Sequence, residues 1–300
     1  MNNILQKALN KSKGPLSIAV INQANCLSSS SINNTWRLKL KTGEELFAKI
    51  TCKEDFSKLK YEASGLDSLR KFNDPNLIEI PQPLVLTCVE NHAILILPWL
   101  NFGIGDQRIL GKGLALLHQA STTSHPNQFG WEVDGFIGAG NQQGGWRKSW
   151  GECFTNLRLL PQLKTAKKWG LNSNDWKTLL NQIIVFLDKD KPSPVLVHGD
   201  LWSGNFSIQK NGKAVIFDPA IWWADREVDL AMTKLFGGFS NEFYSGYEET
   251  WPLKESASSR IEIYNLYHIL NHANIFGGYY KSQALSSLKN LENHLNTSKI

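Results

Sequence analysis

The stretch HGDLWSGN occupies residues 198–205 and follows a short apolar run at residues 195–197. It contains Asp200 and Asn205, while Asp218 ends a second apolar run at residues 214–217. Two carboxylates and one amide are therefore expected on two loops between short β-strands. Phosphoryl transfer requires such a set, because one carboxylate accepts a hydroxyl proton while an amide oxygen and a second carboxylate hold Mg²⁺. We expect Asp200 to be the catalytic base and Asn205 and Asp218 to be the metal ligands.

Each of these residues also has a structural interpretation. Asp200 and Asn205 are common turn or cap residues, and Asp218 precedes Pro219, which suits a turn at the end of a strand. The combined pattern between two apolar runs favours the catalytic interpretation. For His198 we expect a structural role, with its ring bonded to nearby backbone, because no second cluster of histidines has metal-ligand spacing.

Upstream, Lys49 lies in an apolar run, where its charge costs solvation free energy unless an anion pairs with it. Glu62, on the helix predicted next, is the expected partner, and the pair would direct Lys49 toward nucleotide phosphates. The alternative is that both residues are exposed on the surface. The serines at residues 28–31 occupy a turn that is either a plain hairpin or a phosphate lid, in which Ser29, Ser30 and Ser31 would donate hydrogen bonds.

The segment at residues 225–231, DREVDLA, predicts the start of a helix. Asp225 is a candidate N-cap, and acidic residues suit the first turn of a helix. We expect Asp229 to brace the Asp200 loop through hydrogen bonds rather than to contact substrate. Several of the eleven tryptophans lie near the central motif. They form either ordinary core packing or a flat surface on which a sugar or base stacks.

The pattern of the chain predicts an α+β, bilobal fold. Strand-like runs at residues 16–24, 32–41, 46–50, 84–88 and 93–97, with a helix at residues 55–72, fill an N-terminal lobe at residues 1–98. Residues 99–300 are mostly helical apart from the central motif, and a polar connection at residues 121–145 is too long for an ordinary loop. Alternating runs around Asn211-Gly212 predict a hairpin between the two apolar runs.

Composition narrows the class of protein. The net charge of +5 is mild and its lysines are scattered, so nucleic acid is not an expected partner. Four cysteines without a CxxC pair favour a reducing, cytoplasmic location over a disulfide framework. No N-terminal secretory signal and no membrane-spanning stretch are recognised. We expect a cytoplasmic monomer or weak homodimer.

Residues 198–239 resemble the fructosamine kinase (ketosamine-3-kinase) family. The resemblance rests on HGDLWSGN, on FDPA at residues 217–220, on DREVDLAM at residues 225–232 and on LFGGF at residues 235–239. The segments FGW at residues 129–131, DGFIG at residues 134–138 and RLLPQL at residues 158–163 agree with it. His-Gly-Asp alone would indicate only the wider aminoglycoside-phosphotransferase and choline-kinase group, and the Trp202 and Asp-Arg-Glu segments narrow it.

The resemblance implies a protein-kinase-like fold and ATP-dependent phosphorylation of the 3-hydroxyl of a sugar ketoamine on an amine or lysine. The product sheds its sugar, so the implied role is deglycation. Carried onto this chain, the family pattern makes Asp200 the base, Asn205 and Asp218 the Mg²⁺ ligands, and Lys49 with Glu62 the phosphate contact. The stretch Pro98, Trp99 and Leu100 would meet adenine. Trp202, Trp222 and Asp225 are our candidate substrate contacts.

This chain departs from the family in its nucleotide-binding loop, which has serines at residues 28–30 where glycines are usual. Some members of the family have a cysteine in this loop that makes them sensitive to oxidation. In this chain Ser31 lies near that position, so we do not expect redox control. Two alternatives stay open. One is a kinase of the same fold that phosphorylates an aminoglycoside or amino alcohol, and the other is a catalytically weak nucleotide-binding regulatory protein.

Overall fold

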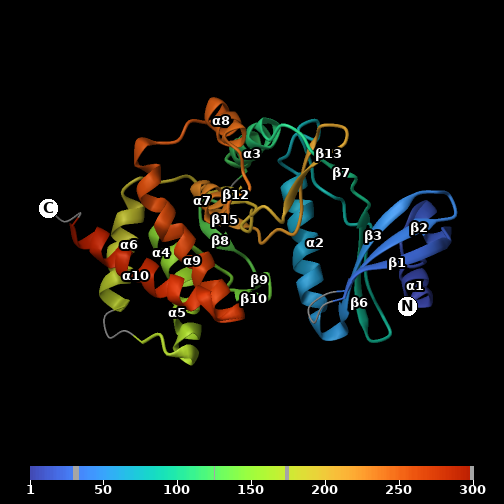
Figure 1. The fold of residues 1–300 in the computed structure, drawn as a ribbon, viewed down its shortest axis with the longest axis horizontal. Helices are drawn as coiled ribbons and strands as arrows, with labels where there is room; N and C mark the ends of the chain where they lie inside the picture. The colour runs from blue at the N-terminus through green and yellow to red at the C-terminus, as the bar shows by residue number, and fades with distance from the viewer. Residues whose placement is uncertain (30–33, 125, 173–175, 298–300) are drawn as a thin grey trace.

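The computed structural model describes residues 1–29, 34–124, 126–172 and 176–297. It has two lobes, with a sheet at one end, a helical body at the other, and α2 (Phe56–Arg70) between them (Figure 1). The mixture of an antiparallel sheet and many helices confirms the predicted α+β class.

The N-terminal lobe is a five-stranded antiparallel sheet in the order β1-β2-β3-β6-β5. Its strands are β1 (Ile21–Ser29), β2 (Asn34–Leu40), β3 (Glu45–Cys52), β5 (Val85–Val89) and β6 (His92–Pro98). The helix α1 (Asn2–Leu9) packs on the sheet through the buried Leu5 and Leu9, where they join Leu38 and Ile96 in one apolar cluster. Each of the five strand-like runs expected from the sequence overlaps one of these strands.

One predicted strand begins in the wrong place. The apolar run at residues 16–24 divides into a 3₁₀ helix at Gly14–Ile18 and the start of β1 at Ile21. Pro15 lies in the first turn of that helix, where its fixed φ and missing N–H are tolerated. Apolar residues on both sides of this boundary, from Leu16 to Ile21, concealed it.

The C-terminal part contains most of the helices (Figure 1). They are α3 (Arg108–Ser121), α4 (Trp150–Phe154), α5 (Leu160–Ala166), α6 (Trp176–Asp188), α7 (Glu227–Leu235), α8 (Asn241–Thr250), α9 (Ser258–Phe276) and α10 (Tyr279–Thr297). A π-helix at Thr155–Leu159 joins α4 to α5, so Pro161 lies in the first turn of α5 and does not interrupt a helix.

Short strands carry the central motif. β12 (Val195–Val197) pairs with β15 (Trp222–Ala224) in a sheet with β8 (Phe129–Trp131) and β11 (Gly145–Arg147). β13 (Phe206–Gln209) and β14 (Ala214–Ile216) form the predicted hairpin, with Gly212 at φ 83° in its turn. The connection predicted at residues 121–145 also includes a small hairpin, β9 (Gly135–Ile137) and β10 (Gly140–Gln142).

Two further short strands join the β13–β14 hairpin in a separate four-stranded sheet, in the order β4-β14-β13-β7. β4 (Ile78–Glu79) runs parallel to β14, and β7 (Phe102–Gly103) pairs with β13. β4 belongs to the first 98 residues but pairs with β14, near the central motif. The lobe boundary between residues 98 and 99 therefore stays a prediction. Among the described residues no helix is long and apolar enough to cross a membrane.

Candidate active site

The candidate catalytic loop leaves β12 and is fixed by its own side chains. His198 is fully buried, its Nε2 lies 3.0 Å from the Phe217 carbonyl, and its Nδ1 lies 3.3 Å from the Asp200 N–H. Burial lowers the pKa of His198, which favours the neutral ring. A neutral ring that donates from Nε2 and accepts at Nδ1 satisfies both contacts. His198 thus occupies the structural position that the sequence predicts, between the Asp200 loop and the segment before Asp218.

Asp229, on α7, holds the same loop through hydrogen bonds to its backbone. Its two carboxylate oxygens accept the N–H groups of His198 and Gly199, each at 2.8 Å. Burial alone would raise the pKa of Asp229, but hydrogen bonding and charge from His118, with further contributions from His198 and Gly199, hold it below its usual value. The carboxylate is therefore ionised and rigidly held, in the bracing position that we expected.

His118 is a support residue that sequence reasoning missed. It lies on α3, fully buried, with Nε2 at 3.1 Å from Asp229 and Nδ1 at 2.9 Å from the Tyr247 hydroxyl. Its sequence signal is weak: it is a histidine among the leucines of an amphipathic helix, far along the chain from the central motif.

Asp200 and Asn205 meet at the loop. The Asn205 side-chain amide donates to the Asp200 carbonyl at 2.8 Å and lies 3.3 Å from the Asp200 carboxylate and 3.4 Å from the Asp218 carbonyl. Burial and the nearby charge of Asp218 raise the pKa of Asp200 to about 7. A carboxyl group poised near neutral pH suits a general base.

Lys49 joins the two parts of the molecule. From β3 its ammonium group bonds Glu62 on α2 at 2.8 Å and also forms an ion pair with Asp218. Burial alone would lower the pKa of Lys49, but the carboxylates of Asp218 and Glu62 outweigh it and raise that pKa. The expected Lys49–Glu62 pair is present, and the alternative of two exposed surface residues is wrong because both side chains are largely buried.

Asp218 has an unusual backbone. Its φ of 57° lies in the left-handed region, which non-glycine residues rarely adopt and which costs free energy. Strained residues of this kind cluster at functional sites. The turn at Asp218 presents its carboxylate to Lys49, with 42% of the side chain still exposed.

A cavity of about 270 Å³ opens beside these residues. Leu27, Thr35 and Phe47 from the sheet, Leu100 and Phe102 beyond it, and Lys49 with Asp218 are part of its lining. Pro98 and Trp99 also line it, and the Trp99 N–H is already bonded to the Glu45 carbonyl. The mostly apolar lining with a few charged groups at one end is typical of a small-molecule site.

The serine loop is only partly described. Ser29 ends β1 opposite Asn34, whereas Ser30 and Ser31 lie outside the described residues. Both interpretations of this loop, as a phosphate lid or as a plain hairpin, therefore stay predictions.

The structure contradicts two of the candidate substrate residues. Trp222 has no exposed surface and packs on Trp150 at 5.4 Å and under the Arg158 guanidinium at 3.9 Å, so no sugar can stack on it. Of the two accounts of the tryptophans, core packing is correct for Trp222. By contrast Trp202, in the catalytic loop, keeps 39% of its surface exposed.

Asp225 lies at the other end of the β12–β15 pair from the catalytic loop. Ala224 is opposite Val195, whereas Asp200 follows Val197 at the opposite end. Asp225 is buried and accepts hydrogen bonds from the Tyr264 hydroxyl at 2.7 Å and from the Glu227 N–H at 3.1 Å. It lies just before α7, whose N-cap residue is Arg226, so both the expected N-cap position and the expected substrate contact of Asp225 are wrong.

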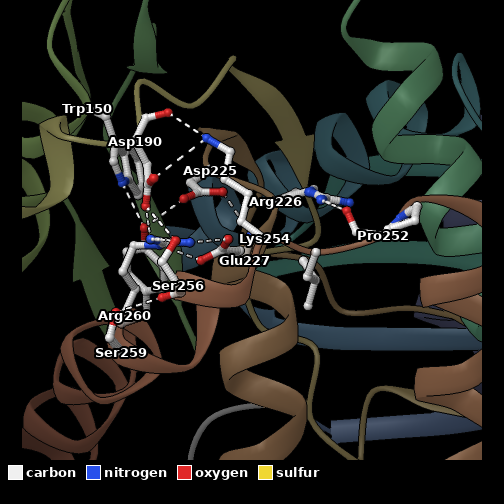
Figure 2. Close-up of polar contacts among 12 residues, drawn as sticks. Trp150, Asp190, Asp225, Arg226, Glu227, Pro252, Lys254, Ser256, Ser259 and Arg260 are labelled. Atoms are coloured by element: carbon white, nitrogen blue, oxygen red, sulfur yellow. Dashed lines mark hydrogen bonds and ion pairs between the residues drawn. The ribbon is translucent and has the colours of Figure 1, made fainter.

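The Asp225 region is a buried charge network. Arg260, on α9, makes two 2.7 Å bonds to the Glu227 carboxylate and also pairs with Asp190 (Figure 2). This network ties the start of α7 to α9, so it supports the helix that carries Asp229.

The metal site predicted from the sequence has oxygen donors only. The amide oxygen of Asn205 and the carboxylate of Asp218 are the ligand types that Mg²⁺ prefers. Among the described residues no group of three or more His, Cys, Asp and Glu side chains forms a metal site. Two protein oxygens therefore fit a metal ion that is completed by water and nucleotide phosphates, as is usual for Mg²⁺.

Comparison with known proteins agrees with this geometry. The family model described as "Fructosamine kinase" matches residues 1–294. The chain belongs to the fructosamine kinase family. It is an ATP-dependent kinase by that membership, in accord with the Lys49, Asp200 and Asp218 arrangement.

Two curated relatives are similar to this chain in sequence over most of its length. A Synechocystis protein named "Probable ketoamine kinase" is 41% identical over 249 residues, covering 82% of each chain. A Vibrio parahaemolyticus protein of the same name is 38% identical, covering 86% of this chain and 88% of its own length. A solved Haemophilus somnus structure, assigned as a fructosamine-3-kinase, has a TM-score of 0.85 with 27% identity, covering 96% of this chain and 97% of that one. The protein-kinase-like fold is thereby confirmed.

Proposed function

We propose that the protein transfers the γ-phosphoryl group of ATP to the 3-hydroxyl of a ketosamine, a ribulosamine or fructosamine adduct on an amine or a protein lysine. The observation that carries the proposal is the Lys49 contact, which joins Glu62 and Asp218 across the two lobes beside Asp200 and Asn205. This is the arrangement by which kinases align phosphates, metal and acceptor. Membership of the fructosamine kinase family supports the acceptor class.

Separate groups of the site bind the adenine, the phosphates and the metal ion. The apolar cavity takes the adenine, with backbone groups of Pro98 and Leu100 as its edge, and Lys49 binds phosphate oxygens. Pro98 has no N–H, and that of Trp99 is engaged by Glu45, so the Leu100 N–H is the donor for the base. Asn205 and Asp218 would hold Mg²⁺, which would neutralise phosphate charge.

Asp200 orients the acceptor hydroxyl and takes its proton as the O–P bond forms. The hydrogen bonds that His198, Asn205 and Asp229 make around the loop fix the carboxylate before substrate arrives, so little reorganisation is needed. The bond between the γ-phosphorus and the ADP oxygen breaks as the new phosphate ester forms. Asp200 accepts the proton of the acceptor hydroxyl.

Trp202 is the proposed sugar contact. Its exposed ring is two residues from Asp200 and meets Phe236 edge-on, at a centroid distance of 6.5 Å. An aromatic face suits the C–H face of a sugar better than it suits a polycationic aminoglycoside, which would require acidic groups. We further propose a cytoplasmic location, which the four free cysteines support. The monomeric or weakly dimeric state remains a prediction.

An acceptor panel tests the proposal. The purified protein is incubated with MgATP and ribulosyl-lysine, fructosyl-lysine or a set of aminoglycosides, and the products are identified by NMR. We expect 3-phosphorylated ketosamine from the wild type and none from Asp200→Asn, which should still bind ATP. Selective turnover of an aminoglycoside would refute the proposed acceptor. Binding of MgATP without any turnover would favour the regulatory alternative.

A further inference from the structure

The β9–β10 hairpin contacts the helix that carries Glu62. Gly135 of β9 faces the ring of Tyr61 on α2 so closely that an added Cβ would lie 2.2 Å from it. Phe136 packs edge-on against the same ring, at a centroid distance of 6.2 Å. Figure 1 shows the hairpin beside α2, on the side facing the helical body. The long connection at residues 121–145 therefore has a definite contact surface that the proposed chemistry does not use.

Gln142, at the end of β10, is the centre of this contact. Its side chain is 2% exposed. The amide nitrogen donates to the Tyr61 hydroxyl at 2.9 Å and to the Ala220 carbonyl at 3.2 Å. The amide oxygen accepts from the Tyr267 hydroxyl, on α9, at 3.0 Å. One buried amide thus connects α2, the segment that follows Asp218, and a helix of the C-terminal body.

The Tyr61 hydroxyl completes the connection by donating to the Ile221 carbonyl at 2.6 Å. Ala220 in turn donates its N–H to the His198 carbonyl at 2.8 Å. One turn along α2, Gly65 lies against Pro219, where an added Cβ would be 3.0 Å from the ring. Three successive residues after Asp218, at positions 219–221, therefore contact α2 or the Gln142 amide.

Tyr61 immediately precedes Glu62, whose carboxylate holds Lys49. Movement of α2 away from the body would break the Tyr61 hydrogen bonds and withdraw Glu62 from Lys49 together. We propose that Gln142 is a positioning residue, which fixes α2 through Tyr61 so that Glu62 remains paired with Lys49 before nucleotide binds. The chain thereby keeps its phosphate-binding pair assembled by an internal contact, without a modification or a partner protein.

The energetic basis is the cost of unmaking a buried polar junction. Replacing Gln142 by leucine keeps the volume but leaves the Tyr267 hydroxyl and the Ala220 carbonyl without the amide. A buried polar group that loses its hydrogen-bond partner destabilises the folded arrangement that buries it. Displacing α2 so that water reaches these groups relieves that cost, so the variant should populate states in which Glu62 is withdrawn.

The test compares Gln142→Leu with Gln143→Leu, the same change at the adjacent, exposed side chain. For Gln142→Leu we expect roughly a tenfold weaker affinity for a non-hydrolysable MgATP analogue and a higher KM for MgATP, since about 1.4 kcal/mol corresponds to tenfold. The KM for the acceptor should be unchanged, and Gln143→Leu should match the wild type. Unchanged nucleotide affinity in folded Gln142→Leu would overturn the proposal. The analogue measurement needs no acceptor, so it is independent of the ketosamine assignment.

A double-mutant cycle separates positioning from general destabilisation. If Gln142 acts through Glu62, then Glu62→Gln should remove most of the effect of Gln142→Leu on nucleotide affinity. Multiplicative effects of the two changes would contradict this route. Tyr61→Phe keeps the ring against Phe136 and removes only the hydroxyl, and it should reproduce the nucleotide defect even if Gln142→Leu does not fold. Normal affinity in Tyr61→Phe would also overturn the proposal.

Discussion

Asp200 illustrates how local environment sets the chemistry of one side chain. Its carboxylate is held by a buried loop, and the hydrogen bond from Asn205 favours the ionised form. Burial, the larger effect, acts with Asp218 to raise its pKa to about 7. The same residue type on an exposed loop would titrate near 4 and would be a weaker base.

The raised pKa predicts the pH dependence of activity. A general base works only when deprotonated, so kcat/KM should rise with pH and level off above about pH 7. Below that value it should fall about tenfold per pH unit. Initial rates at low acceptor concentration, from pH 5.5 to 8.5, measure this profile. A wild-type profile that stays flat down to pH 5.5 would contradict the assignment of Asp200 as the base.

At the scale of single residues, the sequence indicates site candidates whose neighbours along the chain are distinctive. Turn residues and apolar runs surround His198, Asp200, Asn205 and Asp218, and this local pattern is why the sequence indicates them as candidates. Trp222 was misassigned because a tryptophan in a three-residue strand can face either side, and the pattern does not say which face is buried. His118 was missed because its partner Asp229 lies 111 residues away along the chain.

At the scale of elements, α7 acts as a platform for the catalytic loop. Its Asp229 accepts two backbone N–H groups of the loop, while Asp225 and the Glu227–Arg260 pair fix its first turn. The sequence predicted this helix and the role of Asp229, but not the Arg260 contact. Pairing between helices distant in sequence depends on packing, which local periodicity does not encode.

Asp229→Asn should therefore weaken both stability and catalysis. An amide presents only one acceptor oxygen to two N–H donors, so one buried N–H of residues 198–199 loses its partner, at a cost of about 1–3 kcal/mol. We expect a lower urea midpoint and a reduced kcat, with the KM for MgATP little changed. Asp67→Asn, at an exposed position of α2, is the matched control. Wild-type stability in Asp229→Asn would show that the loop is not anchored through α7.

The connection at residues 121–145 shows where prediction of elements fails. Its strands β8 to β11 have three residues each, too few to establish a two-residue alternation. Gly130 and Gly145 have positive φ values of 123° and 115°, so their strands require glycine rather than typical strand residues. The sequence therefore indicates only a long polar connection here, although the contacts of Gly135 and Gln142 give it a defined structure.

At the scale of the whole molecule, one apolar cluster is shared between the lobes. It includes Leu66 of α2 and Leu95 of β6, together with Leu114 of α3 and Leu196 of β12. A second cluster lies within the N-terminal sheet and a third within the helical body. The cavity beside Lys49 is lined from both lobes, by Lys49 and by Phe217. The candidate active site thus lies over a core that neither lobe completes alone.

The shared core predicts that the lobes unfold together. Leu66 is fully buried on the central helix, and truncation of a buried leucine to alanine costs about 2–5 kcal/mol through lost burial and the cavity left behind. In Leu66→Ala, native-state hydrogen exchange should show the same loss of protection in the slowest amides of β3 and of α9, because global opening exposes both. Leu285→Ala, at a leucine with 51% exposure on α10, should change neither. If protection fell in β3 alone, the N-terminal sheet would open independently, and Lys49 would not be held against Asp218 by the common core.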